Sequence, residues 1–426
     1  MDARVLRLCL ALPLLGLPPS SAAAQTGAAR YYPGPDAEWE RRAPADVGMD
    51  ASLIAEAIAF ARDSETPGTR DLEEAHYLSF GREPYGEAIG AFKPRGEQTG
   101  VILRHGYIIA EWGEPQRVDM TFSVTKSFLS TTVGLAHDRG LIGAVSDTVA
   151  GYMAPVVAAP WVAGIAGSVR AANADGAGGE RLGDVAPFEL FSSAHNRRIT
   201  WDDLLRQVSD WEGTLWGKPD WADRPSGEPA TWRTRERNTP GSVFEYNDVR
   251  VNLLALAATN VWRRPLPEVL REHVMDPIAA SPTWRWHGYE NSWIVIDGSA
   301  VQAVSGGGHW GGGMFISARD QARFGLLTLR RGRWDGRQIL SEEWITMATT
   351  PTPANPGYGF MNFFLNTGRE LLPSAPEDVW VHLGAGTNMI YCDPVNDLII
   401  VSRWVRRDAM DGIVARVLSA LTAAEQ

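Results

Sequence analysis

The sequence is poor in cysteine, with two residues in a chain of 426. Cys9 lies in an N-terminal apolar segment, so a mature chain without that segment would keep Cys392 alone. An internal disulfide bond is then impossible, and the fold must depend on its hydrophobic core. The eight histidines lack the spacing of metal ligands, and no phosphate-loop motif is present. We therefore expect no metal and no organic cofactor.

Lysine is also scarce, since the chain has only Lys93, Lys126 and Lys218. The net charge is −11. This negative charge argues against a nucleic-acid partner and against adhesion to anionic membranes. After the N-terminus the sequence has no long apolar run, so we expect no membrane anchor. The sequence does not define an oligomeric state.

The first 24 residues have the pattern of a signal peptide. Arg4 and Arg7 precede a short apolar run at 8–17, and small residues at 22–24 form a cleavage-like site. The apolar run is too short to span a bilayer. The sequence therefore predicts a signal peptide at 1–24 and an exported protein, either periplasmic or secreted.

A Ser-x-x-Lys pair stands out at Ser123 and Lys126. The apolar spacing after it predicts a helix that begins near Ser123 and ends at Gly140. Residues three apart share a helix face, so the two side chains can meet. The helix start disfavours an ammonium and so favours a lysine able to take the serine proton, which arginine could not do. The alternative is that Ser123 caps the helix and Lys126 is a solvated first-turn residue.

The remaining pattern is that of an α+β protein. Apolar periodicity predicts helices at 51–63, 318–330 and 411–421, and a helix at 199–205 with Thr200 as its N-cap. β-rich runs at 100–104, 107–112, 389–392 and 398–404 predict strands, the first two joined by a tight turn. The glycine- and proline-containing stretch 66–99 is predicted to be loop. Strands near both ends suggest one sheet built from both parts of the chain.

Five stretches, in order, resemble motifs of the serine β-lactamase-like superfamily. This group includes class C β-lactamases, penicillin-binding carboxypeptidases, family VIII esterases and 6-aminohexanoate-dimer hydrolases. The matching stretches are 122–128, 204–211, 240–248, 311–320 and 382–384. The resemblance implies an antiparallel sheet flanked by terminal helices. It also implies that 37–140 and 300–426 form the α/β part of the domain and that 141–299 is an inserted, mainly helical part.

The resemblance implies a catalytic centre of Ser123, Lys126 and Tyr246. A phenol beside an ammonium can share its proton, accept from the serine and return a proton to the leaving group. The alternative for Tyr246 is a buried core tyrosine. The resemblance also points to the backbone N–H groups of Ser123 and Ala385 as an oxyanion hole, with Gly384 allowing close approach. Alternatively, this glycine-rich stretch is only a turn between strands.

Two positions depart from the family pattern. His382 and Leu383 stand where the family has lysine and a hydroxyl residue that help to hold a substrate carboxylate, which implies a weaker hold here. Asp248 replaces the asparagine of Tyr-x-Asn. If its carboxylate lies near Lys126 it favours the ammonium, and Tyr246 as phenolate would then be the base. The alternative is that Asp248 caps the following helix.

The sequence thus predicts a serine hydrolase that cleaves an ester or amide of a small molecule through an acyl-enzyme. An esterase or a linear-amide hydrolase of the 6-aminohexanoate-dimer type is the first hypothesis. A β-lactamase or D-Ala-D-Ala carboxypeptidase is the alternative with the same mechanism. A non-catalytic ligand-binding relative is the alternative of another class.

Overall fold

The computed structural model describes residues 30–159 and 189–422. The described residues from Tyr31 onward belong to one compact unit. The predicted signal peptide at 1–24 lies outside the described residues. Within the described ranges, no helix is long and apolar enough to cross a membrane.

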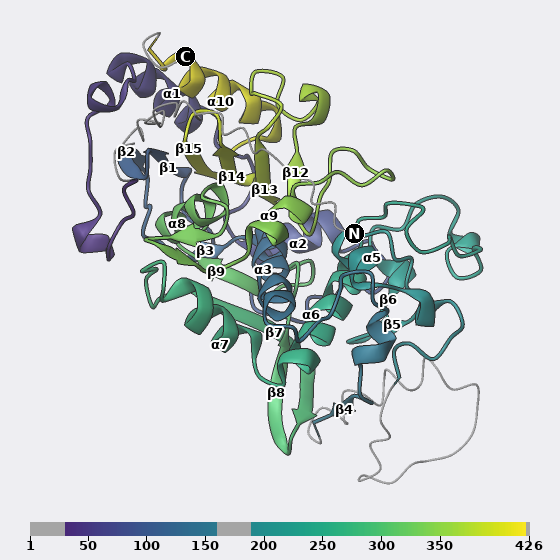
Figure 1. Cartoon of the computed structure of the whole chain (residues 1–426). Coiled ribbons are helices and arrows are strands. Elements are labelled where there is room, and N and C mark those ends of the chain that lie inside the picture. The colour runs from purple at the N-terminus through teal and green to yellow at the C-terminus, as the bar shows by residue number, and fades with distance from the viewer. Residues whose placement is uncertain (1–29, 160–188, 423–426) are drawn as a thin grey trace, which may run out of the picture. The chain divides into compact units, whose positions relative to one another are not determined.

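The main sheet joins strands from both parts of the chain, as predicted. Among the described residues it has six antiparallel strands in the order β12-β13-β14-β15-β1-β2 (Figure 1). They are β1 (Thr99–Arg104), β2 (Tyr107–Trp112), β12 (Phe364–Leu365), β13 (Trp380–Gly384), β14 (Asn388–Asp393) and β15 (Leu398–Arg403). The predicted turn between β1 and β2 has positive φ at His105 and Gly106, which suits a tight hairpin.

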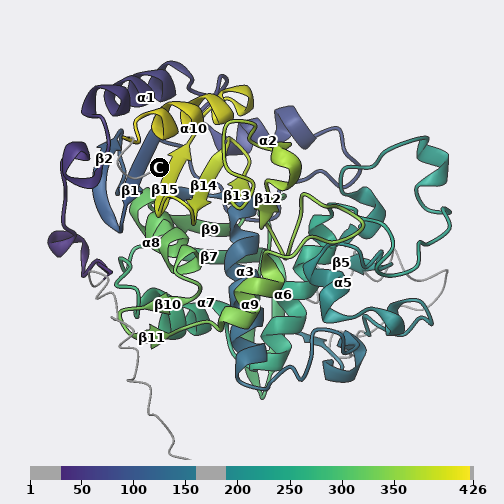
Figure 2. The same cartoon turned by 45° about the horizontal axis from the view of Figure 1, so that its top comes forward.

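Helices cover both faces of this sheet. In β1, Val101 and Leu103 belong to the core under α8 (Ala318–Leu329), whereas Ile102 belongs to the core under α1 (Ala51–Asp63) and α10 (Met410–Ser419). This alternation is the period of two expected of a strand. Figure 2 shows α1 and α10 together on one side of the sheet and α8 on the other. The predicted α+β class with flanking terminal helices is confirmed.

A second sheet was not predicted from the sequence. Its strands are β3 (Asp119–Met120), β4 (Val157–Ala158), β7 (Arg285–Ile296), β8 (Ser299–Val304) and β9 (Gly313–Ile316). Two short ribbons pair β5 (Thr214–Leu215) with β6 (Lys218–Pro219), and β10 (Arg333–Trp334) with β11 (Arg337–Gln338). The segment 141–299 holds all of β7 as well as α5 (Trp201–Leu205), α6 (Asp248–Trp262) and α7 (Leu266–Leu270). The division of the chain at 140 and 300 stays a prediction.

The helix predicted after Ser123 is α3 (Thr125–Asp138), which is followed by Gly140 at a positive φ of 70°. Every residue of α3 from Thr125 to Ala136 is buried, and the helix packs against α6 and α7. Near its C-terminal half, the indole of Trp344 from α9 (Glu342–Ala348) lies close to Gly134. α3 is therefore a core helix that holds the Ser123 turn from within.

The prediction of loop throughout 66–99 is wrong, because α2 (Leu72–Phe80) lies inside it. The Asp71 carboxylate accepts hydrogen bonds from the N–H groups of Glu73 and Glu74, which is an ordinary N-cap. Its apolar periodicity is weak because Leu72 and His76 are its two buried residues, whereas Leu78 is 76% exposed.

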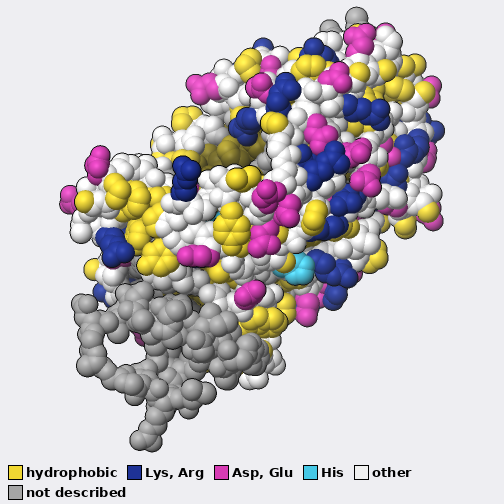
Figure 3. Space-filling model, turned by 180° about the vertical axis from the view of Figure 1, so that it is seen from behind, with side chains coloured by type: hydrophobic (Ala, Val, Ile, Leu, Met, Phe, Trp, Pro, Cys, Tyr) yellow, Lys and Arg dark blue, Asp and Glu magenta, His cyan; other side chains and the backbone are white. Residues whose placement is uncertain are grey.

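On the face shown in Figure 3, acidic and basic side chains are interspersed without a continuous basic area.

We expect Gly134→Ala to destabilise the protein by about 1–3 kcal/mol, because the added Cβ would lie 2.6 Å from the Trp344 indole. The higher helix propensity of alanine, about 1 kcal/mol, offsets only part of this overlap. Denaturant unfolding would measure the change. Gly151→Ala is the matched control, because its Cβ would meet nothing nearer than Thr148 Oγ1 at 3.9 Å. Equal stability of the two variants would contradict this account of α3 packing.

Candidate active site

Ser123 lies in a short 3-10 turn, Phe122–Val124, that leads into α3. Phe122 has a φ of 49°, a left-handed backbone conformation that is unfavourable for a residue with a side chain. Ser123 is partly exposed, and the buried Lys126 Nζ donates to its Oγ at 2.9 Å. The structure thus brings together the two members of the predicted Ser-x-x-Lys pair.

Asp248 contacts Lys126 from the first turn of α6. Its Oδ1 lies 2.6 Å from Lys126 Nζ, and neither side chain is exposed. The cap of α6 is Asn247, whose side chain accepts from the Arg250 N–H, so the alternative that Asp248 caps this helix does not hold. A Cβ at position 307 would overlap both Asp248 and Lys126. Only glycine fits where this loop closes over the ion pair.

Tyr246 lies beside the same pair. Lys126 Nζ is 4.7 Å from the centre of the Tyr246 ring. Burial and then the Asp248 carboxylate raise the pKa of Tyr246 well above its usual value, against the opposing effects of Arg224 and of a hydrogen bond with Ser123. The phenol therefore keeps its proton. This argues against the prediction that Tyr246 acts as a phenolate base and favours a role as proton donor.

The end of β13 packs directly on the Ser123 turn. A Cβ at Gly384 would overlap the carbonyl oxygen of Thr121 and would lie 3.2 Å from the Ser123 nitrogen. Ala385, next in the chain, lines the same cavity as Ser123. This proximity is what an oxyanion hole formed by the N–H groups of Ser123 and Ala385 requires, although that role stays a prediction.

The structure does not bring His382 to the cavity. Its side chain is fully buried between Phe324 and Phe363, with ring centroids 5.5 and 4.6 Å away. Burial lowers the pKa of His382 to about 3, so the ring is neutral at pH 7. Leu383 belongs to the core on the opposite face of the sheet. Neither side chain can therefore hold a substrate carboxylate.

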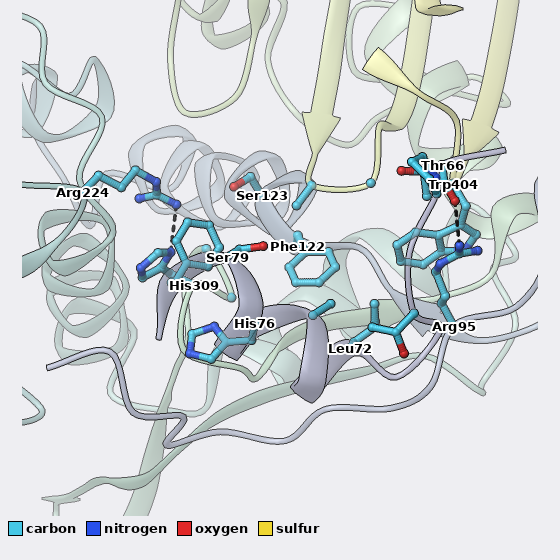
Figure 4. Close-up of a pocket in the computed structure, with 18 residues that line it drawn as sticks. Thr66, Leu72, His76, Ser79, Arg95, Phe122, Ser123, Arg224, His309 and Trp404 are labelled. Atoms are coloured by element: carbon cyan, nitrogen blue, oxygen red, sulfur yellow. Dashed lines mark hydrogen bonds between the residues drawn. The ribbon is translucent and has the colours of Figure 1, made fainter. Parts of the chain in front are cut away.

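The cavity at Ser123 has a volume of about 230 Å³, which is small for a ligand site. As Figure 4 shows, Arg224 and His309 lie at one end, Ser123 and Phe122 near the middle, and Trp404 at the other end. The wall between these ends comes largely from α2, the helix that the sequence reading missed. Its contributions are Leu72, Ala75, His76, Ser79 and Phe80.

Arg224 and His309 were also missed, because both lie in loops that match no motif. Arg224 donates to Asp248 Oδ2 at 2.9 Å and to Asp223 Oδ1 at 2.6 Å. It also faces His309 Nδ1 at 3.0 Å, so that nitrogen is the acceptor, and His309 Nε2–H then donates to Glu83 at 3.0 Å. One signal in the sequence pointed to Arg224. Asp248 stands where the family has a neutral asparagine, and the added negative charge calls for a cation besides Lys126.

The Glu83, Asp223 and His309 side chains place their ligand atoms within 4.8 Å of one another. This donor set does not fit a metal ion, because His309 Nε2 carries the hydrogen when Nδ1 accepts from Arg224. The Arg224 guanidinium already occupies the position of the cation among these groups.

Comparison with known proteins shows the family and the fold of this chain. Residues 101–404 match the family model described as Beta-lactamase. The fold resembles a putative β-lactamase from Bacteroides dorei DSM 17855, with 12% identity, a TM-score of 0.53, and coverage of 87% of this chain and 99% of that chain. It also resembles EstCE1, a hydrolase with promiscuous acyltransferase activity, with 14% identity, a TM-score of 0.52, and coverage of 87% of this chain and 98% of that chain. A family VIII carboxylesterase is similar as well, with 16% identity, a TM-score of 0.50, and coverage of 87% of this chain and 96% of that chain. No match was found among curated proteins.

The antiparallel sheet, its flanking helices and these likenesses identify a protein of the serine β-lactamase-like superfamily. More particularly, the chain belongs to the Beta-lactamase family, whose model covers more than half of its length. This is a family of serine hydrolases.

The burial of His382 predicts a specific dependence of stability on pH. Between pH 6.5 and about pH 3 the unfolded chain binds a proton at His382 that the folded protein does not, so acid destabilises the fold. His382→Leu removes this effect. We expect the free energy of unfolding of the variant, relative to wild type, to rise by about 1.4 kcal/mol for each pH unit between pH 6 and about pH 3.

Denaturant unfolding at a series of pH values measures this difference. Between pH 7.5 and 8.5 the difference should be constant, which serves as the internal control. A difference that is also constant between pH 6 and pH 4 would show that His382 is not a neutral buried histidine.

Proposed function

We propose that this protein is a serine hydrolase that cleaves an ester or a linear amide of a small molecule through an acyl-enzyme on Ser123. The observation that carries the proposal is the 2.9 Å contact between Lys126 Nζ and Ser123 Oγ at the wall of the cavity. Lys126 is fully buried with its Nζ against Ser123 Oγ, where a lysine, unlike an arginine, can receive the serine proton.

In the proposed reaction, Ser123 Oγ attacks the substrate carbonyl and its proton passes to neutral Lys126. Asp248 stabilises the ammonium that forms, and the N–H groups of Ser123 and Ala385 would stabilise the oxyanion. Tyr246, which keeps its proton at rest, donates it to the leaving group and regains one from Lys126. Water then attacks the acyl-serine, with the same groups moving its proton back to Ser123 Oγ.

The charges near Ser123 favour an uncharged substrate. Arg224 is paired with Asp248 and Asp223, and Arg95, which also lines the cavity, is paired with Glu65. No cationic side chain from β13 reaches the cavity, because His382 is neutral and buried. This supports an esterase or linear-amide hydrolase ahead of a β-lactamase or D-Ala-D-Ala carboxypeptidase, whose substrates carry a carboxylate.

We expect Ser123→Ala to abolish both labelling by a fluorophosphonate probe and hydrolysis of p-nitrophenyl esters, because no other group in the proposed mechanism can form the acyl intermediate. Intact-protein mass spectrometry measures labelling, and peptide mapping locates it. Ser127→Ala is the matched control, since Ser127 is buried one turn further along α3. Labelling that persists in Ser123→Ala would refute the role of Ser123 as nucleophile, and a wild-type protein that is never labelled would favour the non-catalytic alternative.

We expect kcat/KM for p-nitrophenyl acetate or butyrate to exceed that for nitrocefin by at least about tenfold, since one missing charge-assisted hydrogen bond to a carboxylate is worth about 1.5–3 kcal/mol. Steady-state kinetics on both substrates measures the ratio. A clear preference for nitrocefin would reverse the order of the two enzyme hypotheses.

A further inference from the structure

Arg224 occupies a central position among the charged groups next to Ser123. Its side chain is 33% exposed and lines the cavity (Figure 4). Nη1 donates to both Asp248 and Asp223, and Nη2 donates to His309. The guanidinium also lies 5.3 Å from the centre of the Tyr246 ring. It therefore contacts Asp248 and Tyr246, two of the groups that lie beside Lys126.

The two oxygens of Asp248 face two different cations. Oδ1 lies on Lys126 and Oδ2 lies on Arg224, at 2.6 and 2.9 Å. Burial alone would raise the pKa of Asp248, but the charges of Lys126 and Arg224 outweigh it and hold that pKa below the usual value. Asp248 is therefore an anion, and a carboxylate close to one amine favours the charged form of that amine.

We propose that Arg224 is a positioning residue that acts through Asp248 to keep neutral Lys126 accessible at the working pH. Its positive charge offsets the Asp248 charge, so Lys126 can lose a proton without leaving a buried anion uncompensated. Its hydrogen bond to Oδ2 also fixes the orientation in which Oδ1 meets Lys126. This inference rests on the proposed function of Lys126 as the base for Ser123.

Three further groups hold Arg224 in place. Asp223 is fully buried and accepts from both Arg224 and the Asp248 N–H. His309 accepts from Arg224 and donates to Glu83, which lies just beyond α2. Loops on either side of the cavity thus fix one guanidinium, and its place does not depend on a bound substrate.

Lysine titration can be observed directly because the chain has three lysines. Protein labelled with ¹³C at lysine Cε would give three NMR signals, which Lys93→Arg and Lys218→Arg would assign. We expect the Lys126 signal of Arg224→Gln to titrate at a pH about one unit or more above that of wild type. Asp248→Asn in the Arg224→Gln background should move the titration back to lower pH.

Arg224→Lys keeps the positive charge, so its Lys126 signal should titrate at a pH close to that of wild type. This variant separates the effect of the charge from the effect of side-chain packing. Arg233→Gln is the matched control, because Arg233 is an exposed arginine that packs on Trp221 outside this network. Unchanged Lys93 and Lys218 signals would show that each variant is folded. In kinetics, the acidic limb of the kcat/KM profile of Arg224→Gln should move by the same amount as the NMR titration.

The inference is overturned if Lys126 titrates at the same pH in wild type and Arg224→Gln. It is also overturned if Arg224→Lys shifts the Lys126 titration as far as Arg224→Gln does. A wild-type Lys126 that stays protonated throughout the pH range of the folded protein would overturn it as well. These results are independent of turnover. Failure of Ser123 to react with the fluorophosphonate would instead refute the proposed function, while the NMR titrations would still decide the role of Arg224.

Discussion

The buried contact between Lys126 and Asp248 is the interaction on which the centre of this protein depends. An ion pair without solvent is costly unless each charge is fully satisfied by neighbours. Here Ser123 accepts from Lys126, Arg224 donates to the second Asp248 oxygen, and Gly307 leaves the space that the pair needs. The first turns of α3 and α6 must therefore meet in one geometry. The pair thus aligns the turn that holds Ser123 with the tyrosine that precedes α6.

The site combines a rigid interior with an adaptable wall. α3 is buried along nearly its whole length and fixes Ser123 and Lys126 from the core side. The opposite wall is α2, a short helix with most of its surface exposed, together with loop residues such as Arg224 and His309. In a family whose members act on different substrates, chemistry can stay with the core helix while selectivity changes with the wall.

Much of the fold and of the site could be predicted because strong local signals agreed with spacing. The β1–β2 hairpin, α1, α3 and α8 have clear periodicity or caps, and the Ser123–Lys126 pair needs only one turn of helix. The second sheet was missed because β7 lacks a regular alternation, and α2 because it buries so few apolar residues. Arg224 and His309 could not be predicted, since only tertiary folding brings their loops to Asp248. The motif match placed His382 at the substrate site, but its side chain is buried in the core and does not reach the cavity.

The scarcity of lysine acquires a practical meaning once the structure is known. Lys126 is fully buried and the side chain of Lys218 is 4% exposed, whereas that of Lys93 is 41% exposed. Amine-reactive reagents would therefore modify one side chain of the folded protein, besides the α-amino group. Coupling to a resin, a dye or a carrier through the Lys93 side chain would follow without any engineering, and the coupling chemistry would leave the buried Lys126 amine untouched.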